Sequence, residues 1–256
     1  GSKFIVHLTF TSRSLKIPVT TGTCYTIGTA LDGLIEAANR VWPNLKNAQA
    51  VVIGATGTIG SICSQFLLDK VGSLTLIARN KERLSELNSM LNSQNKNHIR
   101  IEVSDDINKS LKNAHIIFLA TNSPLNLIDI LYLSPGAIVF DMSQPRNISE
   151  DNAIKRKDVL VIDGGVVSPP GNVKFNFNFG LAPGLAFACI AETMILALEE
   201  RYESFSLGGN ATLSKVQEIA CLAKKHGFAL SELRSFGKKI TEEQIFNIRN
   251  IVTKRN

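Results

Sequence analysis

A strand that runs directly into evenly spaced glycines constrains the fold of this chain more than any other feature. The apolar run VVI at 51–53 is followed by GATGTIG at 54–60, after which an apolar helix begins. Gly54 permits a sharp turn out of the strand, Gly57 permits backbone to approach a phosphate, and Gly60 permits the helix to pack on the sheet. The unpaired N–H groups of the helix start favour an anion. We therefore predict a dinucleotide site that includes Gly54, Thr56, Gly57, Thr58, Ile59 and Gly60.

The residues after the second predicted strand indicate which dinucleotide binds. An NAD enzyme usually carries Asp or Glu at the end of this strand, where the carboxylate binds the ribose hydroxyls. Here the strand at 74–78 is followed by Arg79 and Asn80, and then by the cations Lys81 and Arg83. A guanidinium matches phosphate oxygens bidentately, so Arg79, with Lys81 or Arg83 near it, favours the 2′-phosphate of NADPH. The alternative is that these charges form the solvated first turn of the next helix.

Strand and helix signals alternate through the central part of the chain, which is the pattern of a doubly wound parallel sheet. The fold class we predict is α/β, a Rossmann-type sheet with additional helices at both ends. We divide the chain into an N-terminal segment with a packing helix (1–46), an NADP-binding domain (47–180) and a C-terminal helical segment (181–256). The predicted strands are 51–53, 74–78, 99–103, 116–120, 137–141 and 159–163, and the predicted helices are 26–41, 58–70, 81–92, 185–202, 213–226 and 242–252.

Loops at the carboxyl ends of the strands supply the rest of the predicted site, because ligands of open parallel sheets bind there. Ala120 and Thr121 begin the loop 120–124, and we assign both residues to the cofactor site. The loops 141–146 and 163–165 hold further small polar residues that could line a nicotinamide and substrate pocket. Ordinary turn chemistry explains the same residue types, and both interpretations stay open.

Composition limits the classes of protein to consider. The chain has 256 residues, 44% of them hydrophobic, which is enough to bury a substantial core. No apolar run approaches the ~18 residues needed to span a bilayer, and the N-terminus lacks a secretory pattern. We therefore expect a cytoplasmic protein without stable membrane insertion. Gly1-Ser2 resembles the remnant of a cleaved expression tag.

The charge of the chain bears on its partners. A net charge of +6 suits an acidic partner, but the basic residues are dispersed, with mild clusters only at 155–157 and 238–239. No motif for nucleic acid is present, so we do not expect that partner. The four cysteines and four histidines lie at no metal-ligand spacing, so we expect no metal. A homo-oligomer is left open.

A cysteine is the candidate catalytic group, because no Tyr is followed four residues later by the Lys that short-chain dehydrogenases need. Cys189 lies near the start of the predicted helix 185–202, and helix N-termini favour the nucleophilic thiolate. Glu192 lies one turn further on and could face the same pocket. The alternative is that Cys189 is a small buried hydrophobe, since free cysteines are commonly buried.

The other three cysteines receive different assignments. Cys63 and Cys221 lie on apolar faces of predicted helices, so we expect both in the core. Cys24 lies in the polar stretch TTGTCYT at 20–26 and is an open rival to Cys189 as the nucleophile.

Several segments together resemble a known family. FACIAETM at 187–194, SFSLGGN at 204–210 and KHGF at 225–228 look like the C-terminal signature of the cyanobacterial-type long-chain acyl-[acyl-carrier-protein] reductases. The TTG at 20–22, the glycine loop and the segment 78–84 fall in matching order. The resemblance implies that Cys189 takes the acyl group from an acyl-carrier protein or acyl-CoA thioester, and that NADPH then delivers hydride to release a fatty aldehyde.

The chain also departs from that family. Family members carry a large additional N-terminal domain, of which almost none is here. Thr23 stands where the family usually has Asn, and Leu207 and Gly209 stand where it has Trp and Arg. Two alternatives stay open: an NADP-binding domain that is inactive alone, and a dehydrogenase similar to shikimate dehydrogenase or glutamyl-tRNA reductase.

Overall fold

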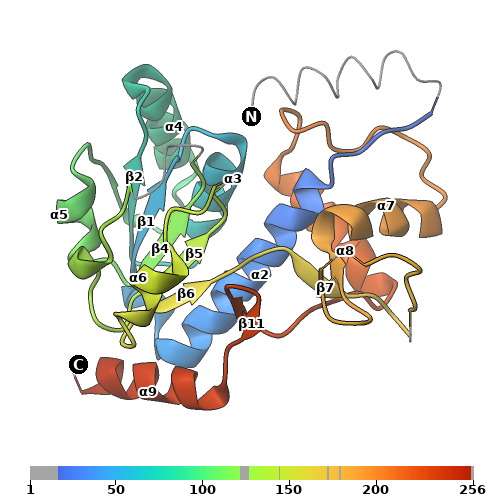
Figure 1. The fold of residues 1–256 in the computed structure, drawn as a ribbon. Coiled ribbons are helices and arrows are strands. Elements are labelled where there is room, and N and C mark those ends of the chain that lie inside the picture. The colour runs from blue at the N-terminus through green and yellow to red at the C-terminus, as the bar shows by residue number, and fades with distance from the viewer. Residues whose placement is uncertain (1–16, 122–126, 144, 172, 179, 255–256) are drawn as a thin grey trace. The chain divides into compact units, whose positions relative to one another are not determined.

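The chain forms two compact units, each assembled from two segments of the sequence (Figure 1). The computed structural model describes residues 17–121, 127–143, 145–171, 173–178 and 180–254. Unit 1 contains the chain up to Asp32 together with Gly164–Glu232, and unit 2 contains Gly33–Asp163 together with Leu233–Asn256. Helix α2 (Thr23–Val41) contributes residues to both units.

A six-stranded sheet forms the centre of unit 2. Every neighbouring pair of its strands is parallel, and their order is β3-β2-β1-β4-β5-β6. This order is that of a doubly wound dinucleotide-binding sheet, so the predicted fold class is confirmed. The strands are β1 (Gln49–Ile53), β2 (Ser73–Ile77), β3 (Arg100–Val103), β4 (Ile116–Leu119), β5 (Ile138–Asp141) and β6 (Leu160–Ile162).

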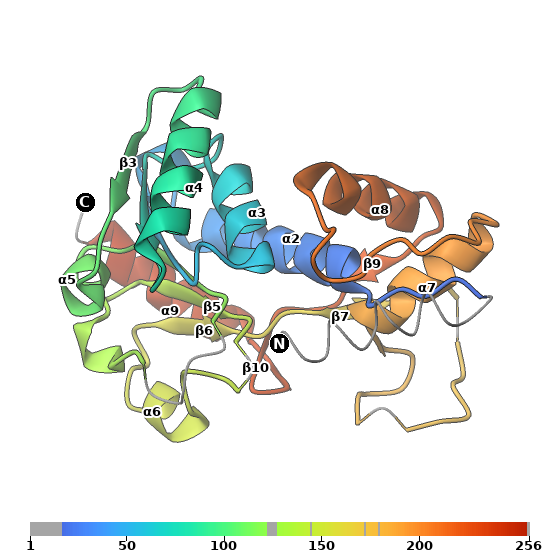
Figure 2. The same cartoon turned by 90° about the horizontal axis from the view of Figure 1, so that it is seen from above.

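The central strands are apolar because both faces of the sheet are covered. All residues of β4 and β5 are buried, and the rings of Phe118 and Phe140 stack across these two strands with centroids 5.8 Å apart. Helices α3 (Thr58–Leu67) and α4 (Lys81–Gln94) lie side by side next to β1 and β2 (Figure 2). The remaining helices of unit 2 are α5 (Ile107–Leu111), α6 (Glu150–Ile154), α9 (Glu242–Thr253) and the 3-10 helices η1 (Leu45–Asn47) and η2 (Ile130–Tyr132).

The predicted C-terminal segment, 181–256, is shared between the two units: residues up to Glu232 belong to unit 1, and Leu233–Asn256 belongs to unit 2. The chain leaves unit 2 after Asp163 and returns to it at Leu233. The Asp163 N–H then donates to the Arg234 carbonyl at 2.8 Å, next to the hairpin of β10 (Arg234–Ser235) and β11 (Lys238–Lys239). Helix α9 follows, and its first turn is closed by a reciprocal capping box between Thr241 and Gln244.

Unit 1 combines a small antiparallel sheet with helices. Its strands are β7 (Val166–Ser168), β8 (Ala186–Phe187) and β9 (Ala229–Leu230), in the order β8-β7-β9. Helix α7 (Ala188–Leu198) follows β8 directly, and helix α8 (Leu213–Lys225) begins at the cap formed by Thr212.

The predicted helix 185–202 is too long at both ends. Ala186 and Phe187 pair with β7, and the Ala188 N–H donates to the Gly165 carbonyl at 2.7 Å, so the helix begins at Ala188. At the other end, Glu200 has a φ of 54°, which is a left-handed conformation that ends a helix. Ala186 and Phe187, which we predicted to be helical, therefore belong to a strand. Within the described part of the chain, no helix is both long and apolar enough to cross a membrane.

Candidate functional site

The glycine loop joins β1 to α3, and two of its glycines are required by the fold itself. Gly54 has a φ of +85°, and a β-carbon there would come within 2.2 Å of the Ala120 carbonyl oxygen. A β-carbon on Gly60 would come within 2.3 Å of the Gly54 carbonyl oxygen. Any larger residue at Gly54 or Gly60 would force the loop away from β4 or from α3, as the sequence pattern predicts.

Gly57 differs from these two glycines. It is exposed, it is the N-cap of α3, and its φ of −76° is open to any residue. A β-carbon there would approach the Gly54 carbonyl oxygen at 3.3 Å and nothing closer, and no side chain caps the first turn of α3. The fold itself does not require a glycine at this position. A phosphate that binds the N–H groups at the start of α3 does require one, because a side chain would obstruct its approach. This geometry fits a dinucleotide.

A cavity of about 520 Å³ brings most of the predicted cofactor residues together. Thr58, Ile59 and Gly60 do not line it, and instead form the first turn of α3 beside it. Residues that were not predicted for the site line it as well: Ile53, Ile77, Ala78, Asp105, Ile107 and Leu127. The predicted residues that line the cavity are Gly54, Thr56, Gly57, Arg79, Asn80, Arg83, Ala120 and Thr121.

The cations of the cavity lie at the end of β2. Arg79, Lys81 and Arg83 are exposed. The Asn80 side chain accepts a hydrogen bond from the Arg83 N–H at 2.9 Å and so caps α4. Lys81 lies 4.0 Å from Asp105, an acid that follows β3 at the same edge of the sheet. The sequence feature that could have indicated a place for Asp105 in the site is its position just after a strand.

The loop after β5 is organised by its own aspartate. Asp141 is buried and accepts hydrogen bonds from the N–H groups of Ser143 (3.0 Å), Asn147 (2.8 Å) and Ile148 (3.2 Å). Asp163 pairs with Arg146 and accepts from the Gly237 N–H at 2.7 Å. The backbone of its own loop therefore accounts for Asp141, whereas Asp163 is held by residues of other segments. Residues 122–124 and Gln144, which belong to the predicted loops, lie outside the described residues.

Cys189 is exposed and is the second residue of α7. Its N-cap residue, Phe187, makes no side-chain cap, so the first turn of the helix lacks a side-chain partner there. The alternative of a buried Cys189 is wrong. Cys221 is also exposed, which contradicts the prediction that it lies in the core, because the apolar face of α8 is formed by Val216, Ile219 and Ala223 instead.

The remaining cysteines are buried. Burial raises the pKa of the Cys63 thiol well above its ordinary value, as expected for a core residue. Burial, together with the nearby Glu192 carboxylate, raises the pKa of the Cys24 thiol to about 11. Thiolates are the nucleophilic form, so Cys24 is a poor rival to Cys189.

Glu192 lies one turn after Cys189 on α7, but its side chain is fully buried. Its carboxylate accepts hydrogen bonds from the Ser206 hydroxyl (2.6 Å), the Tyr25 N–H (2.8 Å) and the Thr20 hydroxyl. The sequence gives no signal for this arrangement, because Thr20 and Tyr25 are far from Glu192 along the chain.

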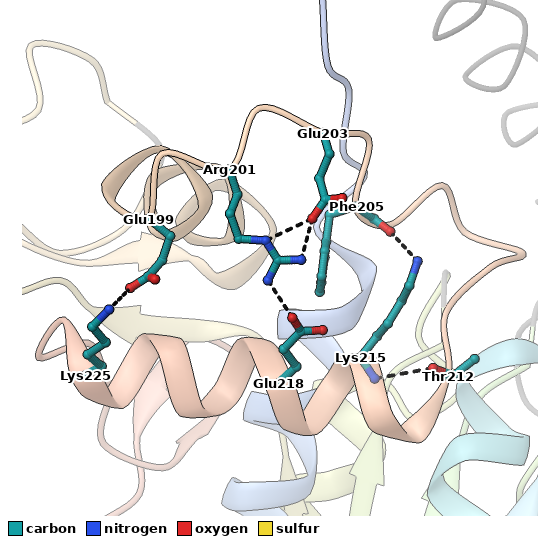
Figure 3. Close-up of polar contacts among 8 residues, drawn as sticks. All are labelled: Glu199, Arg201, Glu203, Phe205, Thr212, Lys215, Glu218 and Lys225. Atoms are coloured by element: carbon teal, nitrogen blue, oxygen red, sulfur yellow. Dashed lines mark hydrogen bonds and ion pairs between the residues drawn. The ribbon is translucent and has the colours of Figure 1, made fainter.

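A polar cluster between α7 and α8 holds the segment that carries Ser206 (Figure 3). The Arg201 guanidinium pairs with Glu203 and with Glu218 (2.5 Å) and lies 5.1 Å from the centre of the Phe205 ring. The Lys215 ammonium donates to the Phe205 carbonyl at 2.9 Å. Glu199, the C-cap residue of α7, binds Lys225 at 2.6 Å and also His226 at the end of α8, and these hydrogen bonds lower the pKa of Glu199.

No metal centre is evident in the part of the chain that the structure describes. No group of three or more His, Cys, Asp or Glu residues there is arranged to hold a metal ion.

Two curated proteins are similar to most of the length of this chain. It is 33% identical over 247 residues to aminotransferase PigE of Serratia sp., a match that covers 93% of this chain and 28% of that protein. It is 29% identical over 217 residues to the long-chain acyl-[acyl-carrier-protein] reductase of Synechococcus elongatus, covering 82% of this chain and 61% of that protein. The chain thus spans less than two thirds of the length of either relative.

The chain also has a likeness to solved structures and a match to a described family. Quinate dehydrogenase from Corynebacterium glutamicum in complex with NAD is similar with a TM-score of 0.41 and 20% identity, over 52% of this chain and 50% of that one. Residues 36–164, half of the chain, match the family described as shikimate / quinate 5-dehydrogenase. The chain therefore belongs to the shikimate / quinate 5-dehydrogenase family.

Proposed function

We propose that this chain reduces a fatty acyl thioester to an aldehyde with NADPH, through an acyl group held on Cys189. The observation that carries the proposal is the position of Cys189, which is exposed in the first turn of α7. Cys24 and Cys63 are buried, and the other exposed cysteine, Cys221, lies in the second half of α8. The 29% identity to an acyl-[acyl-carrier-protein] reductase, which extends over 82% of the chain, supports it.

The first step is acyl transfer. The Cys189 thiolate attacks the carbonyl carbon of the thioester, a new carbon–sulfur bond forms, and the carrier leaves as its thiolate and takes up a proton. When bound, NADPH supplies the hydride that reduces the Cys189 thioester to the aldehyde. The Cys189 sulfur leaves as the thiolate and is free for another cycle. The net +6 charge is compatible with an acidic acyl-carrier protein as the substrate's carrier, and acyl-CoA is the other carrier we propose.

The preference for NADPH over NADH rests on the cations beside the glycine loop. Arg79 lines the cavity at the end of β2, together with Lys81 and Arg83. Lys81 has an acidic neighbour in Asp105 and Arg83 lies within the first turn of α4, so we assign the 2′-phosphate mainly to Arg79.

A second candidate function is favoured by the extent of the family match. Residues 36–164 match the shikimate / quinate 5-dehydrogenase family, and the chain spans only 28% and 61% of the two relatives described above. On this interpretation the chain binds NADP and needs further protein for turnover, or acts as a dehydrogenase of the shikimate dehydrogenase or glutamyl-tRNA reductase type.

Intact-protein mass spectrometry separates the two candidates. Incubation with palmitoyl-CoA or palmitoyl-carrier protein, without NADPH, should add one acyl group to the wild-type chain and none to Cys189→Ala. An adduct that survives in Cys189→Ala would remove the proposed mechanism. Binding of NADPH with no acyl adduct on the wild type would support the second candidate.

A further inference from the structure

The Glu192 carboxylate joins three separate parts of unit 1. Glu192 itself lies on α7, and its donors lie in the segment that leads into the first turn of α2 and in the loop before α8. The hydroxyl groups of Thr20 and Ser206 both donate to Oε1, and the Tyr25 N–H donates to Oε2 at 2.8 Å. A buried carboxylate is costly without partners, and here both of its oxygens have them.

These contacts fix the first turn of α2. Tyr25 is the third residue of α2, so Glu192 accepts one of the N–H groups that a helix start leaves unpaired. Ser206 extends the same arrangement, because its hydroxyl accepts from the Thr23 N–H at 3.1 Å and its carbonyl accepts from the Thr21 N–H at 2.7 Å. A negative charge at a helix start is also favourable for the helix dipole. Glu192 therefore caps α2 from a different helix.

The turn that precedes α2 lies directly against Cys189. A β-carbon on Gly22 would come within 2.1 Å of the Cys189 α-carbon and 2.5 Å of its β-carbon. Glu192 follows Cys189 by three residues, and residues at this spacing share one face of a helix. The side chain that fixes the start of α2 is thus one turn away from the cysteine against which that start packs.

We propose that Glu192 is a positioning residue for Cys189. By holding the segment from Thr20 to Tyr25, Glu192 keeps the Gly22 turn on the Cys189 backbone and restricts the directions from which the sulfur can meet an acyl carbon. This inference rests on the proposed acyl transfer. The role is one of position, because both Glu192 oxygens are buried and together accept three hydrogen bonds from the segments that they hold.

The neutral isostere tests position against charge. In Glu192→Gln, the amide oxygen can accept from the Tyr25 N–H, and the amide nitrogen can donate to the hydroxyl oxygen of Thr20 or Ser206. Glu192→Ala removes every contact. The matched control is Glu199→Ala, which breaks the pairs with Lys225 and His226 at the far end of α7. All variants are made in a Cys221→Ser background, so that Cys189 is the exposed cysteine that is followed.

The first readout is the rate of Cys189 acylation by palmitoyl-CoA, followed by intact mass at a temperature where circular dichroism shows each variant folded. We expect Glu192→Ala to lower the saturating rate by about tenfold to a hundredfold with little change in half-saturation, and Glu192→Gln and Glu199→Ala to stay within about threefold of the parent. If Glu192→Ala does not fold, Ser206→Ala, which removes one donor, should show a smaller loss of the same kind.

The second readout is alkylation of Cys189 by iodoacetamide, which needs no thioester. Release of the Gly22 turn uncovers one side of Cys189, so we expect Glu192→Ala to be alkylated faster although it is acylated more slowly. The inference fails if Glu192→Gln lowers the acylation rate as much as Glu192→Ala does. It also fails if Glu192→Ala behaves like the parent, or if Glu199→Ala lowers the acylation rate as much as Glu192→Ala does. If the parent itself is not acylated, the proposed function fails, and the alkylation rates alone decide the role of Glu192.

Discussion

Gly22 and Cys189 are in backbone contact: a β-carbon on Gly22 would lie 2.1 Å from the Cys189 α-carbon and 2.3 Å from its carbonyl oxygen. Gly22 also has a φ of +71°, which side chains other than that of glycine rarely adopt. The TTG sequence before α2 is thus tied to the cysteine helix by steric fit as well as by Glu192.

We predict that Gly22→Ala lowers the free energy of unfolding much more than the same substitution at Gly171, a glycine with the same backbone conformation. Gly171 has the same φ of +71°, but nothing lies within 4 Å of its β-carbon position. Gly171→Ala should cost about 1 kcal/mol of unfolding free energy, and Gly22→Ala should cost at least about 2 kcal/mol more because the backbones must separate. Urea unfolding measures both. Equal losses would contradict the contact.

In the glycine loop, Gly57→Ala should separate ligand binding from folding. Its β-carbon meets the Gly54 carbonyl oxygen at 3.3 Å, so we expect the unfolding free energy to change by less than about 1 kcal/mol while the Kd for NADPH rises at least about tenfold. Gly60→Ala, whose β-carbon would lie 2.3 Å from the same oxygen, should also cost about 2 kcal/mol or more of stability. Unchanged NADPH binding by a folded Gly57→Ala protein would show that no phosphate lies there.

Arg79→Ala tests which dinucleotide is preferred. A guanidinium that pairs with the 2′-phosphate affects only the cofactor that carries this group, so the Kd for NADPH should rise about tenfold or more and that for NADH by less than about threefold. Titration calorimetry with both cofactors measures this, and Arg83→Ala provides the comparison. Equal losses for NADPH and NADH would mean that Arg79 does not contact the 2′-phosphate.

The buried Cys24 should make stability depend on alkaline pH. Burial raises its pKa from 9.0 to about 11, so the folded protein holds the thiol proton more tightly than the unfolded chain does. The protonated Cys24 thiol therefore contributes its full share to the free energy of unfolding below pH 9.0. This share, roughly 2 kcal/mol, is lost as the pH rises toward about 11. Tyr25, whose pKa is also raised, adds to the loss in the same direction. Urea unfolding across this range should show a decline that Cys24→Ala makes shallower; identical slopes would contradict the assignment.

The sheet was predictable because its strands are short apolar runs between turn residues. The second strand was predicted at 74–78 and lies at 73–77, and the glycine loop predicted the turn at Gly54 and the packing of α3 at Gly60. Both features arise from residues that are neighbours in the sequence. Ala186 and Phe187 show the limit of this approach, since a short apolar run is compatible with a strand or a helix until its partner, β7, is known.

The surroundings of Cys189 could not be predicted in the same way. Thr20 and Ser206 meet Glu192 across 172 and 14 residues of sequence, and no local pattern relates the three. The exposure of Cys221 depends on which face of α8 packs in unit 1, which its mixed sequence leaves undecided. Asp105 lies next to Lys81 because the parallel strands β2 and β3 end at the same edge of the sheet. Its position just after β3 was therefore the sequence feature from which its place at the site could have been predicted.

The fate of an acyl group on Cys189 tests the proposed reduction most directly. The wild-type chain is acylated with palmitoyl-CoA, separated from the excess, and mixed with NADPH while the adduct mass and NADPH absorbance are followed. We predict that the adduct is lost, with about one NADPH oxidised and one aldehyde released per acyl group, as one hydride per acyl group requires. An adduct that persists unchanged in the presence of NADPH would contradict the proposed reduction.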